Sequence, residues 1–147
     1  MTINETQDEI IEEFGLFDDW ADKYEYIIDL GKKLKPLDEQ YKNEVNIIKG
    51  CQSRVWLHAY LQDDKLVFEA DSDAIIVKGL VNILVRTLSN QTPEAIAAAD
   101  VYALEKVGLQ QHLAQTRSNG LAAMLRQMKN YAIAFTSMKS QVQSIKS

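Results

Sequence analysis

Cys51 is the only cysteine of the chain, and its thiol is the most reactive side chain that the sequence offers. It follows Gly50 in a short loop between two predicted strands that are rich in β-branched, aromatic and aliphatic residues. Loops held by a rigid sheet commonly carry function, and a glycine gives such a loop conformations that bulkier residues resist. A lone cysteine is also often an inert core residue, so composition alone leaves both interpretations open.

A reactive Cys51 requires a neighbour that stabilises its thiolate, because the thiol is a poor nucleophile. Lys49 and Arg54 are close in sequence, and His112 or Arg117 could approach through the fold. The sequence does not rank these four side chains.

A cysteine paired with a histidine would indicate a protease or thioesterase, which is the competing enzyme class. The candidate bases are His58 and His112. His58 comes two residues after Trp56, so both side chains point to one face of a predicted strand, which suits packing at least as well as catalysis. One cysteine and two separated histidines form no recognisable zinc pattern, and we expect no metal site.

Asp71 and Asp73 form an acidic pair just before a predicted helix. They could belong to a metal or acid–base site, but acids in this position are primarily good helix caps. We therefore expect them to cap the helix.

The charges are distributed unevenly along the chain. Residues 1–30 hold ten acidic side chains against Lys23, whereas residues 101–147 hold six basic ones against Glu105. Such asymmetry can steer a protein partner, while the net charge of −5 disfavours a nucleic-acid footprint. The longest apolar run, 74–85, is too short for a bilayer, and the acidic N-terminus does not resemble an export signal. We expect a soluble, cytoplasmic protein without membrane or nucleic-acid partners.

Hydrophobic periodicity predicts an α+β fold in one compact domain. A narrow polar stripe of Lys78, Asn82 and Arg86 marks one helix as the central one. Four helices are predicted over 5–16, 20–30, 74–88 and 102–107. A short helix is also predicted to start at Pro93 with Thr92 as its cap, and a long one to start at residue 118 or 119. Strands are predicted over 45–48, 55–61 and 65–70, with a hairpin turn at 62–64. These elements indicate a small antiparallel sheet of about three strands flanked by helices, with the domain over 1–138 and a frayed polar tail over 139–147.

Three segments of the chain, taken together and in order, resemble the SufE family of sulfur acceptors. They are 48–57, which contains Lys-Gly-Cys-Gln-Ser-Arg, 70–80 and 111–121. The resemblance runs from about Gln7 to about Tyr131. Departures are small: Asn82 interrupts an apolar helix, and 114–116 reads Ala-Gln-Thr where Ser-Pro-Ser is common in the family.

The resemblance implies a compact fold like that of IscU-type scaffolds, and it implies a role for Cys51. Its thiolate would take sulfur from a SufS-type, pyridoxal-phosphate-dependent cysteine desulfurase and deliver it to an iron–sulfur assembly complex. The chain would be a carrier and activator rather than an enzyme, and would bind no cofactor itself. A cluster scaffold is a minor alternative, because a cluster requires several ligands and the chain has one cysteine.

The family's cysteine rests in an apolar hollow and moves outward to react. By resemblance, we expect a mobile loop over 49–53 and a partner-facing surface that adds 71–73 and a turn over 117–120. The residues carried over to partner binding or loop positioning are Gly50, Gln52, Ser53, Asp71, Asp73, Arg117 and Asn119.

Overall fold

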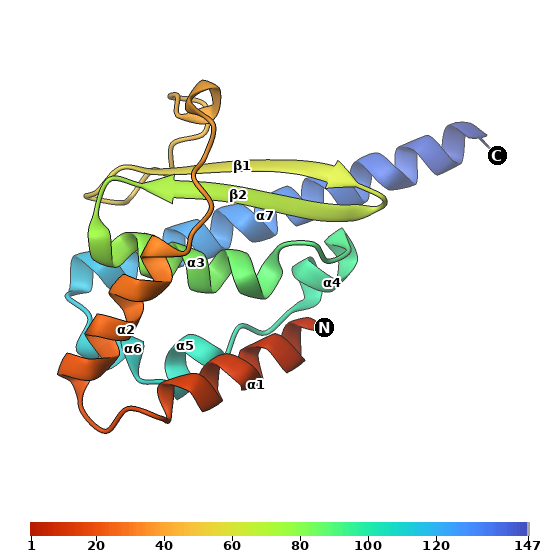
Figure 1. Ribbon diagram of the computed structural model, residues 1–147. Helices are drawn as coiled ribbons and strands as arrows, with labels where there is room; N and C mark the ends of the chain where they lie inside the picture. Colours follow the sequence, from red (N-terminus) through yellow and green to blue (C-terminus); the bar gives the residue numbers. More distant parts are fainter. Residues whose placement is uncertain (147) are drawn as a thin grey trace.

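The computed structural model describes residues 1–146, and it describes side chains for residues 1–115 and 117–139. The fold is α+β: one antiparallel hairpin lies across α3 and α7, and α1, α2 and α5 lie beyond α3 (Figure 1). The elements are α1 (Ile3–Phe14), α2 (Trp20–Lys32), η1 (Glu39–Tyr41), β1 (Val55–Gln62), β2 (Lys65–Ser72), α3 (Ile75–Leu88), α4 (Pro93–Ala98), α5 (Ala103–Lys106), α6 (Leu109–His112) and α7 (Gln115–Lys146).

The predicted hairpin turn is confirmed. Strands β1 and β2 pair from Val55 opposite Ser72 to Gln62 opposite Lys65. Asp63 and Asp64 connect them with φ angles of 52° and 67°. Two consecutive left-handed residues form the turn whose twist matches that of the flanking strands, and aspartate tolerates this conformation better than most residues.

The predicted third strand, 45–48, is wrong, and the described residues form a sheet of two strands. Only an isolated bridge joins Ile47 to Trp56. The side-chain amide of Asn46 donates to the carbonyl of Tyr41, and its backbone amide donates to Asn43, so the chain turns immediately before the bridge. The extended segment is therefore too short for a strand, and Val45 is 87% exposed.

The predicted helix starts at Trp20 and Pro93 are confirmed, and each has a side-chain cap. The Asp19 carboxylate accepts from the amide of Asp22 at 2.9 Å, and the Thr92 hydroxyl accepts from the amide of Ala95 at 3.2 Å. Helix α7 begins at Gln115, slightly before the predicted start at residue 118 or 119.

Helix α3 is central, as its narrow polar stripe predicts, and each member of the stripe binds a neighbouring element. Asn82 donates to the carbonyl of Leu30 at 2.6 Å. Arg86 binds both carboxylate oxygens of Glu13, at 2.9 and 2.6 Å. Lys78 lies beside Asp71 at the end of β2.

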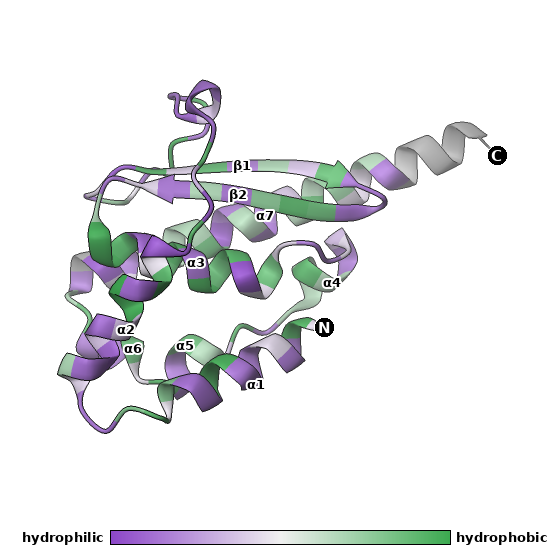
Figure 2. Ribbon diagram, in the orientation of Figure 1, coloured by the Kyte–Doolittle hydropathy of each residue, from purple (hydrophilic) through white to green (hydrophobic). Residues whose placement is uncertain are grey.

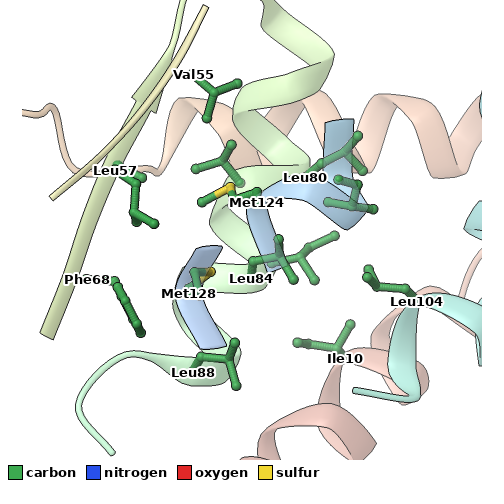
Figure 3. Close-up of a cluster of buried hydrophobic side chains, with 14 of the residues drawn as sticks. Ile10, Val55, Leu57, Phe68, Leu80, Leu84, Leu88, Leu104, Met124 and Met128 are labelled. Carbon is green, nitrogen blue, oxygen red and sulfur yellow. The ribbon is translucent and has the colours of Figure 1, made fainter. Parts of the chain in front are cut away.

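The hydrophobic core lies between the hairpin and the helices. Hydrophobic residues concentrate on the strands and on the inner faces of the helices (Figure 2). The close-up in Figure 3 shows side chains from the hairpin meeting those of α3 and α7. Fully or almost fully buried members include Leu57, Phe68, Leu80, Leu84, Leu88, Met124 and Met128.

Helix α7 continues beyond the body of the domain (Figure 1). The division into a domain over 1–138 and a frayed tail over 139–147 stays a prediction, since the helix reaches Lys146 and Ser147 lies outside the described residues. Across the described part of the chain, every helix is too short or too polar to span a bilayer.

Candidate functional site

Cys51 lies in a short loop that is fixed at both ends. Before the loop, the amide of Ile48 donates to the carbonyl of Val55 at 2.8 Å. Within it, Gly50 has a φ of +96°, a conformation that side chains other than glycine's rarely adopt. A Cβ atom at Gly50 would also lie 3.5 Å from that of Ala123, so the loop passes close over α7.

The sulfur of Cys51 points toward Gly120 of α7. The Sγ–H group donates to the Gly120 carbonyl oxygen, with 3.5 Å between sulfur and oxygen. A Cβ atom built on Gly120 would lie 3.1 Å from Sγ. The helix and the loop therefore meet at this pair of residues, and Cys51 is partly buried.

Beside Cys51 is a hollow of about 280 Å³, formed by the loop, the start of β1, α3 and the first turns of α7. Its walls are mainly aliphatic, and its polar side chains come from the loop and from Arg117. The lining residues are Cys51, Gln52, Ser53, Val55, Val77, Leu80, Val81, Ala114, Arg117, Gly120, Leu121 and Met124.

Burial raises the pKa of the Cys51 thiol above its ordinary value. Of the four candidate cations, only Arg117 lines the hollow. The ring of His112 instead stacks on Trp20, with 3.9 Å between ring centroids. In this conformation the thiol is thus protected and protonated rather than activated.

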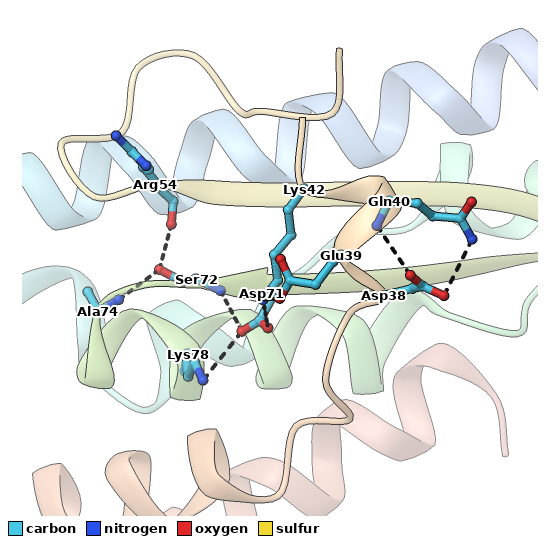
Figure 4. A network of polar contacts seen from close by, with 9 residues as sticks. All are labelled: Asp38, Glu39, Gln40, Lys42, Arg54, Asp71, Ser72, Ala74 and Lys78. Atoms are coloured by element: carbon cyan, nitrogen blue, oxygen red, sulfur yellow. Dashed lines mark hydrogen bonds and ion pairs between the residues drawn. The ribbon is translucent and has the colours of Figure 1, made fainter. Parts of the chain in front are cut away.

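The expectation that Asp71 and Asp73 cap helix α3 is wrong. The N-cap is Ala74, and no side chain bonds to the first turn from that position. The Asp73 carboxylate instead accepts from the amide of Arg54 at 3.1 Å. The Ser72 hydroxyl donates to the Arg54 carbonyl at 2.8 Å and accepts from the amide of Ala74 at 3.2 Å (Figure 4). The Asp73 carboxylate and the Ser72 hydroxyl thus both bind the backbone of Arg54, where the Cys51 loop ends.

Asp71 is buried and forms an ion cluster with two lysines that are partly exposed (Figure 4). Its carboxylate lies 3.4 Å from Lys42 Nζ and 3.5 Å from Lys78 Nζ, and it accepts from the amide of Ser72 at 2.8 Å. Burial alone would raise the pKa of Asp71, but the Ser72 hydrogen bond, Lys78 and Lys42 outweigh it and hold that pKa below its ordinary value. Asp71 therefore ties η1, β2 and α3 together.

The structure brings together some of the predicted site residues and separates others. Gln52, Ser53 and Arg117 line the hollow with Cys51. Asn119 is exposed and accepts a hydrogen bond from Gln115 at 3.0 Å, one turn earlier on the same helix. The expected turn over 117–120 is wrong, because these residues are helical and belong to α7.

Sequence reasoning included Gly120 only in the expected partner-facing turn, and it did not single out Leu121 and Met124, which also line the hollow. The spacing of Leu121 and Met124 is typical of a helix that packs on a core. The signal that could have found the site is Gly120 itself, because a glycine inside a helix is unfavourable without a tertiary reason.

The two histidines lie in aromatic stacks. His58 stacks on Tyr41, with 3.7 Å between ring centroids, on the outer face of the hairpin. Among the side chains that the structure describes, those lining the hollow include neither histidine. The same part of the chain contains no group of three potential metal ligands. This arrangement does not supply the general base of a cysteine hydrolase.

The chain is similar in sequence to known proteins. The family model of SufE, described as an Fe–S metabolism associated domain, matches residues 8–132. An uncharacterized SufE-like protein of Rhizobium etli is 42% identical over 130 residues, covering 85% of this chain and 88% of the relative. One from Rhizobium meliloti is 39% identical over 130 residues, covering 85% and 93%.

A solved structure shares the fold. The solution structure of a hypothetical protein from Thermus thermophilus superposes with a TM-score of 0.74, over 90% of this chain and 96% of the other. Its sequence identity is 19%, so it supports the architecture alone. The family match, by contrast, includes the Cys51 loop, the hairpin, α3 and the walls of the hollow. The chain therefore belongs to the SufE family, and its domain is one associated with iron–sulfur metabolism.

Proposed function

We propose that this protein accepts sulfur from a cysteine desulfurase on Cys51 and carries it, as a persulfide, to iron–sulfur cluster assembly. The observation that supports the proposal most is the position of Cys51. The single cysteine of a SufE-family chain lies on a glycine-hinged loop against an apolar hollow. The hollow offers the sulfur a place away from water and oxidants between encounters.

The proposed chemistry is exchange between thiols. The Cys51 thiolate attacks the outer sulfur of a persulfide on the desulfurase, and a new S–S bond forms at Cys51. The donor's S–S bond breaks, and the donor cysteine leaves as a thiolate that takes up a proton. One sulfur atom moves and no external oxidant or reductant is consumed, so the step requires no cofactor on this chain.

The partner must create the reactive state of Cys51. At rest the thiol is partly buried and its pKa is raised, so it is a weak nucleophile there. Docking of a SufS-type desulfurase, which supplies pyridoxal phosphate, would draw the loop outward and stimulate that enzyme by removing its persulfide. We place this exchange in the reducing cytoplasm, where a lone thiol stays reduced.

We further propose that the docking surface consists of the Cys51 loop and its surroundings. Gly50, Gln52 and Ser53 belong to the loop, and Arg117 lies at the same hollow. Asp71, Asp73 and Asn119 complete the proposed surface. Asp71 is buried, so it would contribute indirectly, by holding in place the elements that carry the loop. An Asp73→Lys variant that still stimulates the desulfurase fully would remove Asp73 from it.

The decisive experiment is intact-protein mass spectrometry after incubation with a cysteine desulfurase and free cysteine, beside a Cys51→Ser control. We expect a gain of one or more sulfur atoms that a reductant removes and that the control lacks. If several desulfurases give no gain, the carrier function is wrong. A cysteine hydrolase would instead form an acyl adduct and turn over a small thioester without a desulfurase.

A further inference from the structure

We infer that Gly120 is a positioning residue that sets the resting place of Cys51. Its missing side chain leaves the space that the sulfur fills, and its carbonyl oxygen binds the thiol in its protonated form. The inference deepens the proposed function and rests on it, because it identifies what holds the sulfur acceptor inward between encounters.

The helical backbone gives no reason for a glycine at position 120. Gly120 lies inside α7, and the glycines with positive φ among the described residues are Gly50 and Gly108. A glycine within a helix costs about 1 kcal/mol relative to alanine, because its backbone loses more freedom on folding. A tertiary contact must therefore explain this glycine.

The nearest contact is with Cys51. The three atoms nearest to a Cβ built on Gly120 are Sγ at 3.1 Å, Cβ at 3.6 Å and Cα at 3.7 Å of Cys51. The 3.1 Å separation is tighter than van der Waals contact, so one of the two residues would have to move. The loop is the part that gives way, because α7 is held in the core by Met124 and Met128.

The carbonyl of Gly120 makes this position selective for the thiol. An S–H group can donate to it, as the 3.5 Å contact shows. A thiolate has no proton to donate and would place its charge against the lone pairs of a carbonyl oxygen. Ionisation, with loss of the proton to solvent, therefore favours the outward position.

The charged groups near Cys51 come from the loop and from α7. Lys49 and Arg54 belong to the loop and its exit, and Arg117 reaches the hollow from α7. The wall from α3 contributes only Val77, Leu80 and Val81. The resting sulfur thus lies at the Gly120 carbonyl beside mainly aliphatic walls, and among the described side chains Arg117 is the cation that lines the hollow.

The test is the rate at which iodoacetamide alkylates Cys51, measured by intact mass without any desulfurase. Gly120→Ala should raise the rate at neutral pH about threefold or more, because the outward fraction of the loop increases. Asn130→Ala is the matched control: it replaces an exposed α7 residue with a better helix former and should leave the rate unchanged. An unchanged or lower rate in Gly120→Ala overturns the inference.

A double-mutant cycle shows whether the contact itself is responsible. Thermal unfolding of Gly120→Ala, Cys51→Ala and the double variant gives the coupling between the two positions. We expect Gly120→Ala to be more favourable to stability in the Cys51→Ala background, because the sulfur that it displaces is gone. Additive effects would mean that the two residues do not compete for space, which also overturns the inference.

The two proposals fail in different ways. If alkylation accelerates but no desulfurase adds sulfur to Cys51, the positioning role stands and the carrier function falls. If sulfur is added normally while the alkylation rate of Gly120→Ala equals that of the wild type, the carrier function stands and Gly120 has no positioning role.

Discussion

The backbone amide of Arg54 donates a hydrogen bond to the carboxylate of Asp73 at 3.1 Å. The amide of Asp73 donates in return to the carbonyl of Arg54 at 3.3 Å. This reciprocal pair fixes the loop of Cys51 where it leaves for strand β1. The exit of the Cys51 loop is thereby held by a residue nineteen positions away from Arg54 in sequence.

Asp73→Ala should loosen that exit. We expect faster amide hydrogen exchange over 49–54 and a loss of about 1 kcal/mol in the free energy of unfolding, because one hydrogen bond to a charged acceptor is removed. Asp73→Asn keeps an oxygen acceptor and should lose less. Equal exchange over 49–54 in wild type and Asp73→Ala would show that the pair does not restrain the loop.

The alkylation of Cys51 should depend on pH in a way that reports its burial. Since the pKa of the folded thiol is raised, the rate should rise with a midpoint above about 8.5, the value of a free cysteine. The same protein in guanidinium chloride should return to the ordinary midpoint. Intact mass measures the alkylation rate against pH for the folded and the denatured protein. A folded midpoint at or below the unfolded one contradicts the described resting state.

The raised pKa of Cys51 also makes the free energy of unfolding depend on pH. A thiol whose folded pKa is raised contributes stability that is present below the unfolded pKa and is lost as pH rises through the folded pKa. Cys51→Ser should therefore be less sensitive than wild type to alkaline pH in denaturant titrations. If both proteins lose the same stability as the pH rises, Cys51 does not contribute to the alkaline dependence.

Asp71 should govern the acid end of the stability profile. Its folded pKa is depressed, so its contribution is present above the unfolded carboxyl pKa of about 3.9 and is lost as pH falls through the lower folded pKa. Asp71→Asn removes the charge between Lys42 and Lys78 and should cost about 2 kcal/mol at pH 7. Urea titrations from neutral pH downward should show the difference between variant and wild type shrinking below pH about 4. A constant difference would mean that Asp71 is not ionised in the fold.

An alanine should destabilise the protein far more at position 79 than at position 120. A Cβ atom at Gly79 would lie 2.0 Å from the carbonyl oxygen of Ile27, where α2 crosses α3. Because both partners are packed helices, Gly79→Ala should destabilise the protein by about 3 kcal/mol or prevent folding. Gly120→Ala should fold with nearly wild-type stability. Thermal unfolding compares the two, and a mild Gly79→Ala variant would contradict the tight helix crossing.

Local patterns alone were enough to predict most helices and the hairpin. Asp19 and Thr92 cap helices from positions next to the segments they cap, and Asp63 and Asp64 form their turn between adjacent strands. The family was also recognisable from short segments in order, and these identified Cys51. Such features depend on neighbours in the chain, so they can be inferred without knowing the fold.

The roles of several polar residues depended on distant partners and were predicted incorrectly. Asp73 has the sequence context of a cap, yet it binds Arg54, and Asp71 binds lysines from two other elements. The segment over 45–48 has strand-forming residues, but hydrogen bonds from Asn46 turn the chain before a strand can form. Propensity favours each local alternative by little, so a tertiary hydrogen bond or ion pair decides it.

The sequence by itself determined that this protein has one thiol, a helix with a narrow polar stripe and the segments of the SufE family. Only the tertiary structure decided what surrounds that thiol. It brings Gly120 from a position 69 residues away to the sulfur, closes an apolar hollow around it and leaves both histidines in aromatic stacks elsewhere. Reactivity depends on desolvation and on the groups within a few ångströms of the sulfur, and those distances are set by packing between segments rather than by order along the chain.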